Sequence, residues 1–268
     1  MEILQYDFMR RAFLVGLMLS IIVPCIGVVV VLRRLSMLGD ALSHTSLAGV
    51  TGGLVLGINP IVGAVVMCVV SALSIEAIRK KLPRYAEMAT AITMSAGVGL
   101  AGVLSGFVKS SANFNSFLFG SIVAISDFEM LLVVLISLAV LGIFVLLYKE
   151  LFFIAMDERT ARLAGVPVRS INFVFTILTA VTVSVAARTV GALIISSLMV
   201  LPVACSMQLA KSYRQTVLLS VLFGVVFTIG GLFLSYYAGL KPGGTIVLIG
   251  VACLVLLLAG RGILGRKG

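Results

Sequence analysis

Long apolar segments alternate with short polar connections along the whole chain. Runs such as Ile21–Leu32 and Ile246–Ala259 carry no charged residue, and such runs approach the ~20 residues that cross a ~30 Å hydrocarbon core as a helix. They are continuous rather than alternating, so they predict membrane helices and not a membrane β-barrel. We expect about nine spans, near residues 9–32, 35–57, 60–78, 88–108, 128–148, 171–187, 190–210, 216–237 and 244–260.

Composition supports an all-α, polytopic integral membrane bundle in the lipid bilayer, with residues 1–268 as a single transmembrane domain. The chain is 61% hydrophobic and 11% charged, whereas a soluble domain is about half apolar and about a quarter charged. Its four cysteines lie in apolar runs and form no Cys-x-x-Cys pair. We therefore expect buried thiols and no permanently bound cofactor.

The basic residues lie in short clusters between the spans, which is typical of a topology signal and not of a surface that binds nucleic acid. When alternate connections are placed on one side, 15 of the 20 Lys and Arg residues share that side. The positive-inside rule makes it the cytoplasm. The C-terminus is then inside and, with nine spans, the N-terminus outside. Arg10 and Arg11 would favour an N-terminus inside if the second segment were re-entrant.

One apolar, glycine-rich run contains the single histidine of the chain, His44, four residues after Asp40. Positions i and i+4 share a helix face, so the carboxylate and the imidazole point the same way. Along a continuous helix counted from Arg34, Asp40 lies ~9 Å and His44 ~15 Å deep. An ionisable residue at such a depth points to a function, and a structural hydrogen-bonded pair is the alternative.

The neighbouring ridge of this segment consists of small residues every four positions: Ala41, Thr45, Gly49, Gly53 and Gly57. Such a ridge lets another helix approach closely, either within the chain or from a second copy at a symmetric interface. Neutral imidazole and carboxylate suit zinc and other first-row divalent metals, and a two-fold dimer would double two ligands to four. Binding needs an unprotonated imidazole, so metal occupancy should weaken in acid.

Two further polar stretches carry expectations. Glu76 is expected to form a surface pair with Lys80, four residues later. Residues 157–169 predict a short amphipathic helix beneath the membrane, either an ordinary connector or a docking helix for a cytoplasmic partner. No GxxxxGK[ST] motif occurs, so ATP-driven transport would need a separate ATPase chain.

Four sequence elements are distinctive: Leu32–His44, Phe119–Ile122, Asp157–Pro167 and Val190–Ala204. The first ends in Gly-Asp-Ala-Leu-Ser-His. Together they resemble the metal-ion ABC importer permeases, the ZnuB-type zinc and manganese uptake family. The last element departs from that family's pattern at Val203, where Ala is usual. The opening at residues 3–9 is most similar to the zinc permeases of Gram-positive bacteria.

The resemblance implies an ABC importer permease fold, multi-pass in a bacterial cell membrane. It implies a permease homodimer on two cytoplasmic ATPase subunits, fed by an extracellular metal-binding protein. Asp40 and His44 would form its metal site. A coupling helix for the ATPase would fall at Thr160, Ala161, Arg162, Leu163, Ala164 and Gly165.

We therefore expect a transport component, not an enzyme, that imports a divalent transition metal. Zinc is the expected substrate, and manganese or iron is the alternative, because family members for different metals share very similar site strings. A secondary metal transporter that works without an ATPase is a competing hypothesis. An intramembrane enzyme is a weaker one, because the chain lacks a second histidine and a His-Glu-x-x-His motif.

Overall fold

The computed structural model describes residues 7–82, 85–108, 127–191 and 194–264. Every regular element in these ranges is an α-helix, which confirms the all-α class. The helices are α1 (Asp7–Leu32), α2 (Met37–Leu56), α3 (Pro60–Lys81), α4 (Ala86–Ser105), α6 (Asp127–Leu146), α7 (Tyr148–Met156), α8 (Glu158–Leu163), α9 (Val168–Val190), α10 (Ile195–Leu209), α11 (Tyr213–Ala238) and α12 (Pro242–Leu264).

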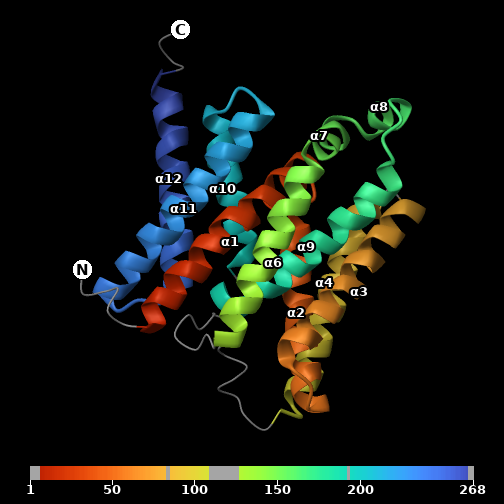
Figure 1. Cartoon of the computed structure of the whole chain (residues 1–268), viewed down its shortest axis with the longest axis vertical. Helices are drawn as coiled ribbons and strands as arrows, with labels where there is room; N and C mark the ends of the chain where they lie inside the picture. The colour runs from red at the N-terminus through yellow and green to blue at the C-terminus, as the bar shows by residue number, and fades with distance from the viewer. Residues whose placement is uncertain (1–6, 83–84, 109–126, 192–193, 265–268) are drawn as a thin grey trace.

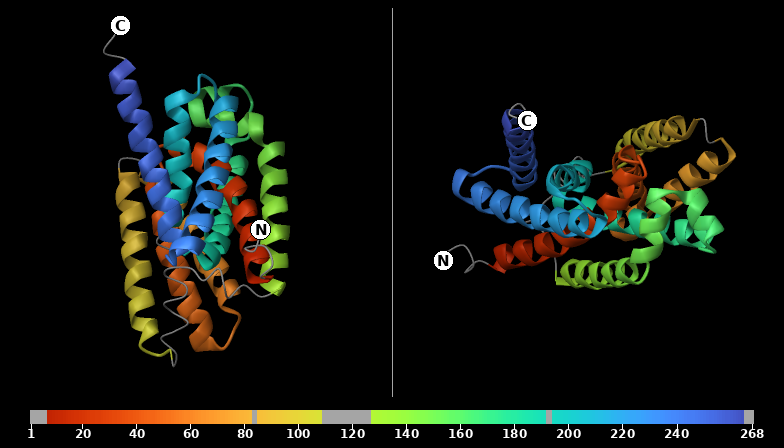
Figure 2. Two further views of the ribbon diagram at one scale, coloured as in Figure 1. Left: turned by 90° about the vertical axis from the view of Figure 1, so that its left-hand side faces the viewer. Right: turned by 90° about the horizontal axis from the view of Figure 1, so that it is seen from above.

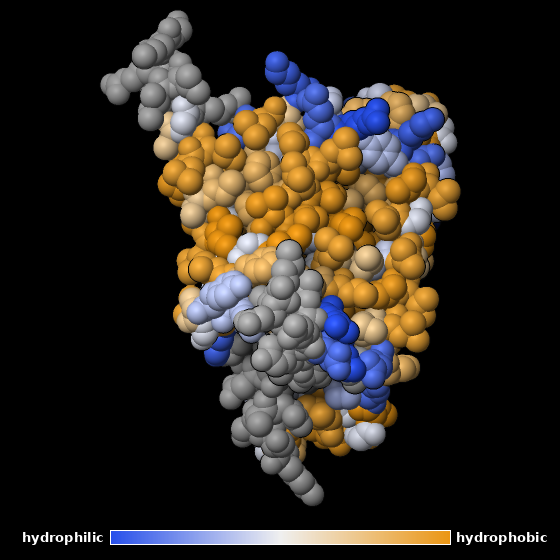
Figure 3. Space-filling view, turned by 60° about the vertical axis from the view of Figure 1, so that its left-hand side comes forward, coloured by the Kyte–Doolittle hydropathy of each residue, from blue (hydrophilic) through white to orange (hydrophobic). Residues whose placement is uncertain are grey.

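Seven helices in the described ranges are long and apolar enough to cross a membrane: α1, α3, α4, α6, α9, α11 and α12. The other two expected spans, α2 and α10, are not among these seven. α2 has 20 residues but includes the polar Asp40 and His44, and α10 has only 15 residues. Figure 3 shows apolar side chains over the middle of one face and hydrophilic ones toward its two ends, as a surface embedded in a bilayer requires.

The spanning helices differ in how deeply they are buried. α1 and α9 are mostly buried, whereas α4, α6 and α12 expose most of their surface. Seen from above in Figure 2, α11 and α12 lie on one side and α3 and α4 on the other, with α2 and α10 between them. The polar helix α2 is therefore enclosed by other helices, with most of its residues buried.

The two ends of the bundle differ in charge. α12 ends at the same end of the bundle as α7 and α8, whereas α1 begins toward the opposite end (Figure 1). The basic residues that follow α1 and those in the last turn of α3 lie beside the end of α7 and the start of α8. We call this end of the bundle the basic end, and the positive-inside rule assigns it to the cytoplasm.

Several expected boundaries were wrong. α6 stops at Leu146, and the separate helix α7 follows it, which the sequence did not reveal. The break expected near Arg188 lies at Gly191, whose φ of 106° falls in the left-handed region that favours glycine. α10 therefore starts at Ile195, five residues after the expected span. The helix expected within residues 157–169 is confined to α8, and residues 119–122 lie outside the described part of the chain.

Candidate metal site

The two candidate ligands lie near the start of α2, close to the basic end. Asp40 is in the first turn, where free backbone N–H groups favour a carboxylate. Residues 33–36 form a turn and not a helix, so the continuous helix assumed from Arg34 was wrong. Measured along α2 from Met37, Asp40 lies about 4.5 Å and His44 about 10.5 Å from the helix start.

The side chains of Asp40 and His44 point toward each other, as the i, i+4 spacing predicts. His44 Nε2 lies 3.8 Å from Asp40 Oδ1, and the two side chains are 19% and 28% exposed, respectively. Two donor atoms on one tetrahedral ion with ~2.1 Å bonds lie about 3.4 Å apart. A shift of a few tenths of an ångström would therefore let both side chains bind the same ion.

A third residue reaches the pair from a helix far away in sequence. The Ser196 hydroxyl on α10 donates a hydrogen bond of 3.2 Å to Asp40 Oδ1, and this contact orients the carboxylate. This contact between helices could not be predicted from the sequence, because most hydroxyls in these helices bond to carbonyls of their own helix. Ser43, for example, donates to the backbone carbonyl of Asp40.

The pair has no further protein ligand of the usual kinds within the described residues. No group of three or more His, Cys, Asp or Glu side chains there is arranged to hold a metal ion. Cys25, Cys68 and Cys205 are buried free thiols, and Cys253 is partly buried. One chain thus brings one carboxylate and one imidazole to this site.

The small-residue ridge of α2 packs within the chain. A methyl group at Gly49 would overlap the backbone of Gly63 on α3, and one at Gly53 would lie 3.1 Å from Pro60 Cα. Gly57 ends α2 with a φ of 70° and has no neighbour within 4 Å of an added Cβ. Because α3 occupies the ridge, its spacing is no argument for a second copy.

The segment expected to couple to an ATPase forms α8 and the turn after it. Asp157 caps the helix by accepting hydrogen bonds from the Thr160 hydroxyl and the Arg159 backbone N–H, and these bonds lower the pKa of its carboxyl group. Leu163 is 89% exposed at the end of α8. Gly165, with a φ of 82°, then turns the chain toward α9.

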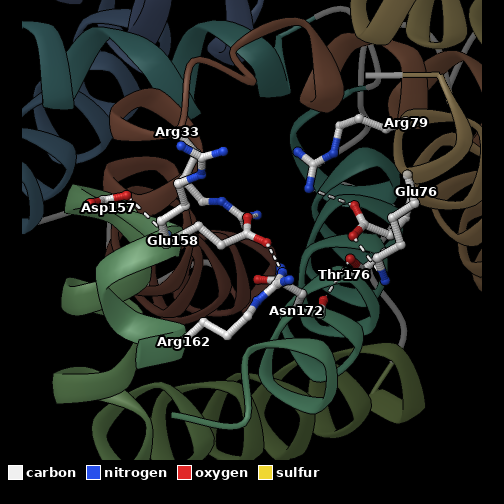
Figure 4. A network of polar contacts seen from close by, with 10 residues as sticks. Arg33, Glu76, Arg79, Asp157, Glu158, Arg162, Asn172 and Thr176 are labelled. Atoms are coloured by element: carbon white, nitrogen blue, oxygen red, sulfur yellow. Dashed lines mark hydrogen bonds and ion pairs between the residues drawn. The ribbon is translucent and has the colours of Figure 1, made fainter. Parts of the chain in front are cut away.

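A network of charged side chains joins α8 to the neighbouring helix ends at the basic end (Figure 4). Arg33 Nη2 lies 3.7 Å from Glu158 Oε2. Glu76 on α3 contacts Arg79 at 2.8 Å and Lys80 at 3.3 Å. The Glu76–Lys80 pair was predicted, but its surface position was wrong, because the Glu76 side chain is only 12% exposed. Glu76 and Glu158 both line one cavity of about 760 Å³.

A comparison with known families decides the kind of protein. The model of the "ABC 3 transport family" matches residues 5–261. The chain belongs to the ABC 3 transport family. It is therefore the membrane permease component of a metal ABC transporter, multi-pass and without a catalytic domain of its own.

Individual relatives of this ABC 3 family chain align along almost its whole length. A "Probable metal transport system membrane protein" from Treponema pallidum is 35% identical and covers 96% of both chains. The "Manganese transport system membrane protein MntC" of Listeria innocua is 31% identical over 96% of this chain and 91% of its own. The "High-affinity zinc uptake system membrane protein ZnuB" of Haemophilus influenzae is 27% identical over 96% of this chain and 99% of its own.

A solved structure shows that the fold is that of an ABC importer permease. "PsaBC from Streptococcus pneumoniae in complex with Fab" superposes with a TM-score of 0.86 at 28% identity, covering 95% of this chain and 92% of that chain. As a component of an ABC transporter, the chain works with an ATPase and a metal-binding protein. Manganese or zinc is implied as the transported substrate.

Proposed function

We propose that this permease imports Zn²⁺ through a site formed by Asp40 and His44, with Mn²⁺ as the second candidate. The observation that carries the proposal is the pair itself: a carboxylate and an imidazole, 3.8 Å apart and partly open, on a helix of the membrane bundle. Both donor types serve zinc and manganese. Relatives named for either metal align with almost the whole chain, so manganese stays a candidate.

Two donors do not complete a tetrahedral metal site, and we propose that a second copy of the permease supplies the other two. A two-fold axis beside α2 would bring two Asp40 and two His44 side chains together. The partial exposure of both side chains leaves room for this approach. Incomplete coordination suits a transport site, because the ion must also leave it.

We further propose that α8 and its following turn, residues 160–165, contact the ATPase in the cytoplasm. α8 lies at the basic end, and its Leu163 side chain is almost fully exposed. An extracellular protein would deliver the metal at the opposite end. Movements of α8 during ATP hydrolysis would then open the site to one side of the membrane at a time.

Metal uptake by cells carrying Asp40→Ala or His44→Ala tests the site. Both variants should lose zinc uptake by more than about a hundredfold. Loss of a group that only supports a metal ligand typically costs ten- to hundredfold in affinity, and loss of the ligand itself should cost more. Ser46→Ala is the matched control, since the Ser46 hydroxyl lies on the same helix and bonds only to the Ser43 carbonyl among the contacts described. Uptake of radioactive Zn²⁺ and Mn²⁺ is measured in parallel, with complex assembly checked by co-purification. Wild-type uptake by either ligand variant would refute the site.

The coupling role of α8 has a separate test at Gly165. Gly165→Pro is incompatible with a φ of 82° and removes the N–H that donates to the Arg162 carbonyl. ATP hydrolysis should continue in the assembled complex while metal transport falls. Unchanged transport per ATP hydrolysed would contradict a coupling role for this turn.

A further inference from the structure

Arg33 is a buried charge at the junction between α1 and α2. Its side chain is only 8% exposed, and its ion-pair partner is Glu158 on α8. Burial and the nearby Arg79 lower the pKa of Arg33, while Glu76 and Glu158 oppose that shift. A buried guanidinium that loses its partner is strongly unfavourable, so α8 and the α1–α2 junction are held together.

The connection from Arg33 to the metal-site helix is short and constrained. Arg34 has a φ of 58°, a left-handed conformation that is rare for a residue with a side chain. The backbone N–H groups of Arg34 and Leu35 donate to the carbonyls of Val31 and Val30, so the turn is fixed to the end of α1. α2 begins at Met37, and Asp40 lies in its first turn. The segment between Arg33 and Asp40 therefore consists of a hydrogen-bonded turn and the first turn of α2.

Glu158 itself sits on the segment exposed to a cytoplasmic partner. It begins α8, and it also contacts Arg162 on the same helix at 3.2 Å. Figure 4 shows Arg33 near Asp157 and Glu158, with Glu76 and Arg79 on the other side of the network. Glu158 is thus the α8 side chain that forms an ion pair with the junction before α2.

We propose that Arg33 is a positioning residue that transmits movement of α8 to the metal-site helix: the Arg33–Glu158 ion pair ties α8 to the turn before α2, and the turn carries the displacement to Asp40. This inference rests on the proposed function, because it takes α8 as the ATPase contact and Asp40 as a metal ligand. It adds a defined route between the two sites.

The test uses the complete complex of permease and ATPase in proteoliposomes, with Zn²⁺ uptake and ATP hydrolysis measured on the same sample. Glu158→Gln should lower the metal transported per ATP hydrolysed by about tenfold, within the range typical of coupling between sites. Lys80→Gln is the matched control. It removes one positive charge from the same cavity and should change the ratio by less than about twofold, since Lys80 pairs with Glu76 on its own helix and not with α8.

A double variant separates transmission from stability. Arg33→Gln together with Glu158→Gln removes the buried guanidinium that Glu158→Gln alone leaves behind, so thermal stability should recover relative to Glu158→Gln. The metal transported per ATP hydrolysed should stay as low as in the single variants. Each single variant already removes the ion pair, so the second substitution has no further effect on it. Recovery of the ratio in the double variant would overturn the inference and leave the ion pair a structural one.

The outcomes distinguish this inference from the function on which it rests. An unsubstituted complex that shows ATP-dependent Zn²⁺ uptake, with an unchanged ratio in Glu158→Gln, overturns the inference alone. An unsubstituted complex that moves neither Zn²⁺ nor Mn²⁺ overturns the proposed function and the inference with it.

Discussion

At the scale of single residues, the candidate site includes a contact between two helices that lie far apart in sequence. Asp40 is a candidate ligand, but the Ser196 hydroxyl fixes one of its oxygens. A ligand whose orientation is set by a neighbour binds metal more tightly, and losing that neighbour typically costs ten- to hundredfold, by order of magnitude. Ser196 thereby makes α10 part of the site.

Ser196→Ala should raise the metal concentration for half-maximal uptake by about tenfold, because the carboxylate loses the donor that holds it. Ser196→Thr keeps a hydroxyl and should retain most of the affinity. The measurement is the concentration dependence of radioactive Zn²⁺ uptake. Equal half-maximal concentrations in Ser196→Ala and the unsubstituted protein would show that this hydrogen bond does not serve the site.

At the scale of the helices, close packing of α2 on α3 holds the candidate ligands in place. The two backbones meet at Gly49 and Gly63, where neither position has room for a side chain. Such an approach maximises van der Waals contact between membrane helices, for which the bilayer provides no hydrophobic driving force. α2 thus depends on α3 for its position.

Gly49→Ala should destabilise the protein by about 1–3 kcal/mol, because its methyl group has to force α2 and α3 apart. Gly52→Ala, on the same helix, is the matched control. Its new methyl group would meet only the Leu104 side chain, at 3.7 Å, so its effect should stay below about 1 kcal/mol. Thermal unfolding in detergent compares the two, and equal melting temperatures would contradict the packing account.

Most helices could be predicted from the sequence, because an apolar run of about 20 residues is typical of a membrane-spanning helix. It predicted the Asp40–His44 pair for a similar reason, since i and i+4 neighbours meet within one helix. Contacts between helices were not predictable. The four-residue spacing of Gly49 and Gly53 indicated a close neighbour, but nothing in it identified α3. Ser196 and the Arg33–Glu158 pair depend on how distant segments pack, and a single sequence carries no such information.

At the scale of the whole molecule, α12 ends at the end of the bundle that carries α7 and α8, whereas α1 begins toward the other end (Figure 1). The basic clusters gather at the end that carries α7 and α8. An odd number of crossings that includes α2 would place the two ends of the chain on opposite sides of the membrane. A re-entrant α2 would instead put both termini on one side, as Arg10 and Arg11 alone would suggest.

A tag before Met1 should therefore be digested by protease added outside intact cells, whereas a tag after Gly268 should be digested only in inverted membrane vesicles. The physical reason is the excess of Lys and Arg at the basic end, which is retained in the cytoplasm. Western blots of both tags provide the measurement. Protection of both tags in intact cells would show that the N-terminus is inside.

The polarity of α2 also has a consequence for how the chain enters the membrane. α2 is long enough to span but is not among the seven helices apolar enough to do so by composition. A carboxylate in a membrane segment disfavours its release into lipid by the insertion machinery. Only residues 57–59 separate α2 from the strongly apolar α3, so the two can leave the translocon as one hairpin already joined at Gly49 and Gly63. The order of synthesis would then protect the polar segment from lipid before the rest of the bundle exists.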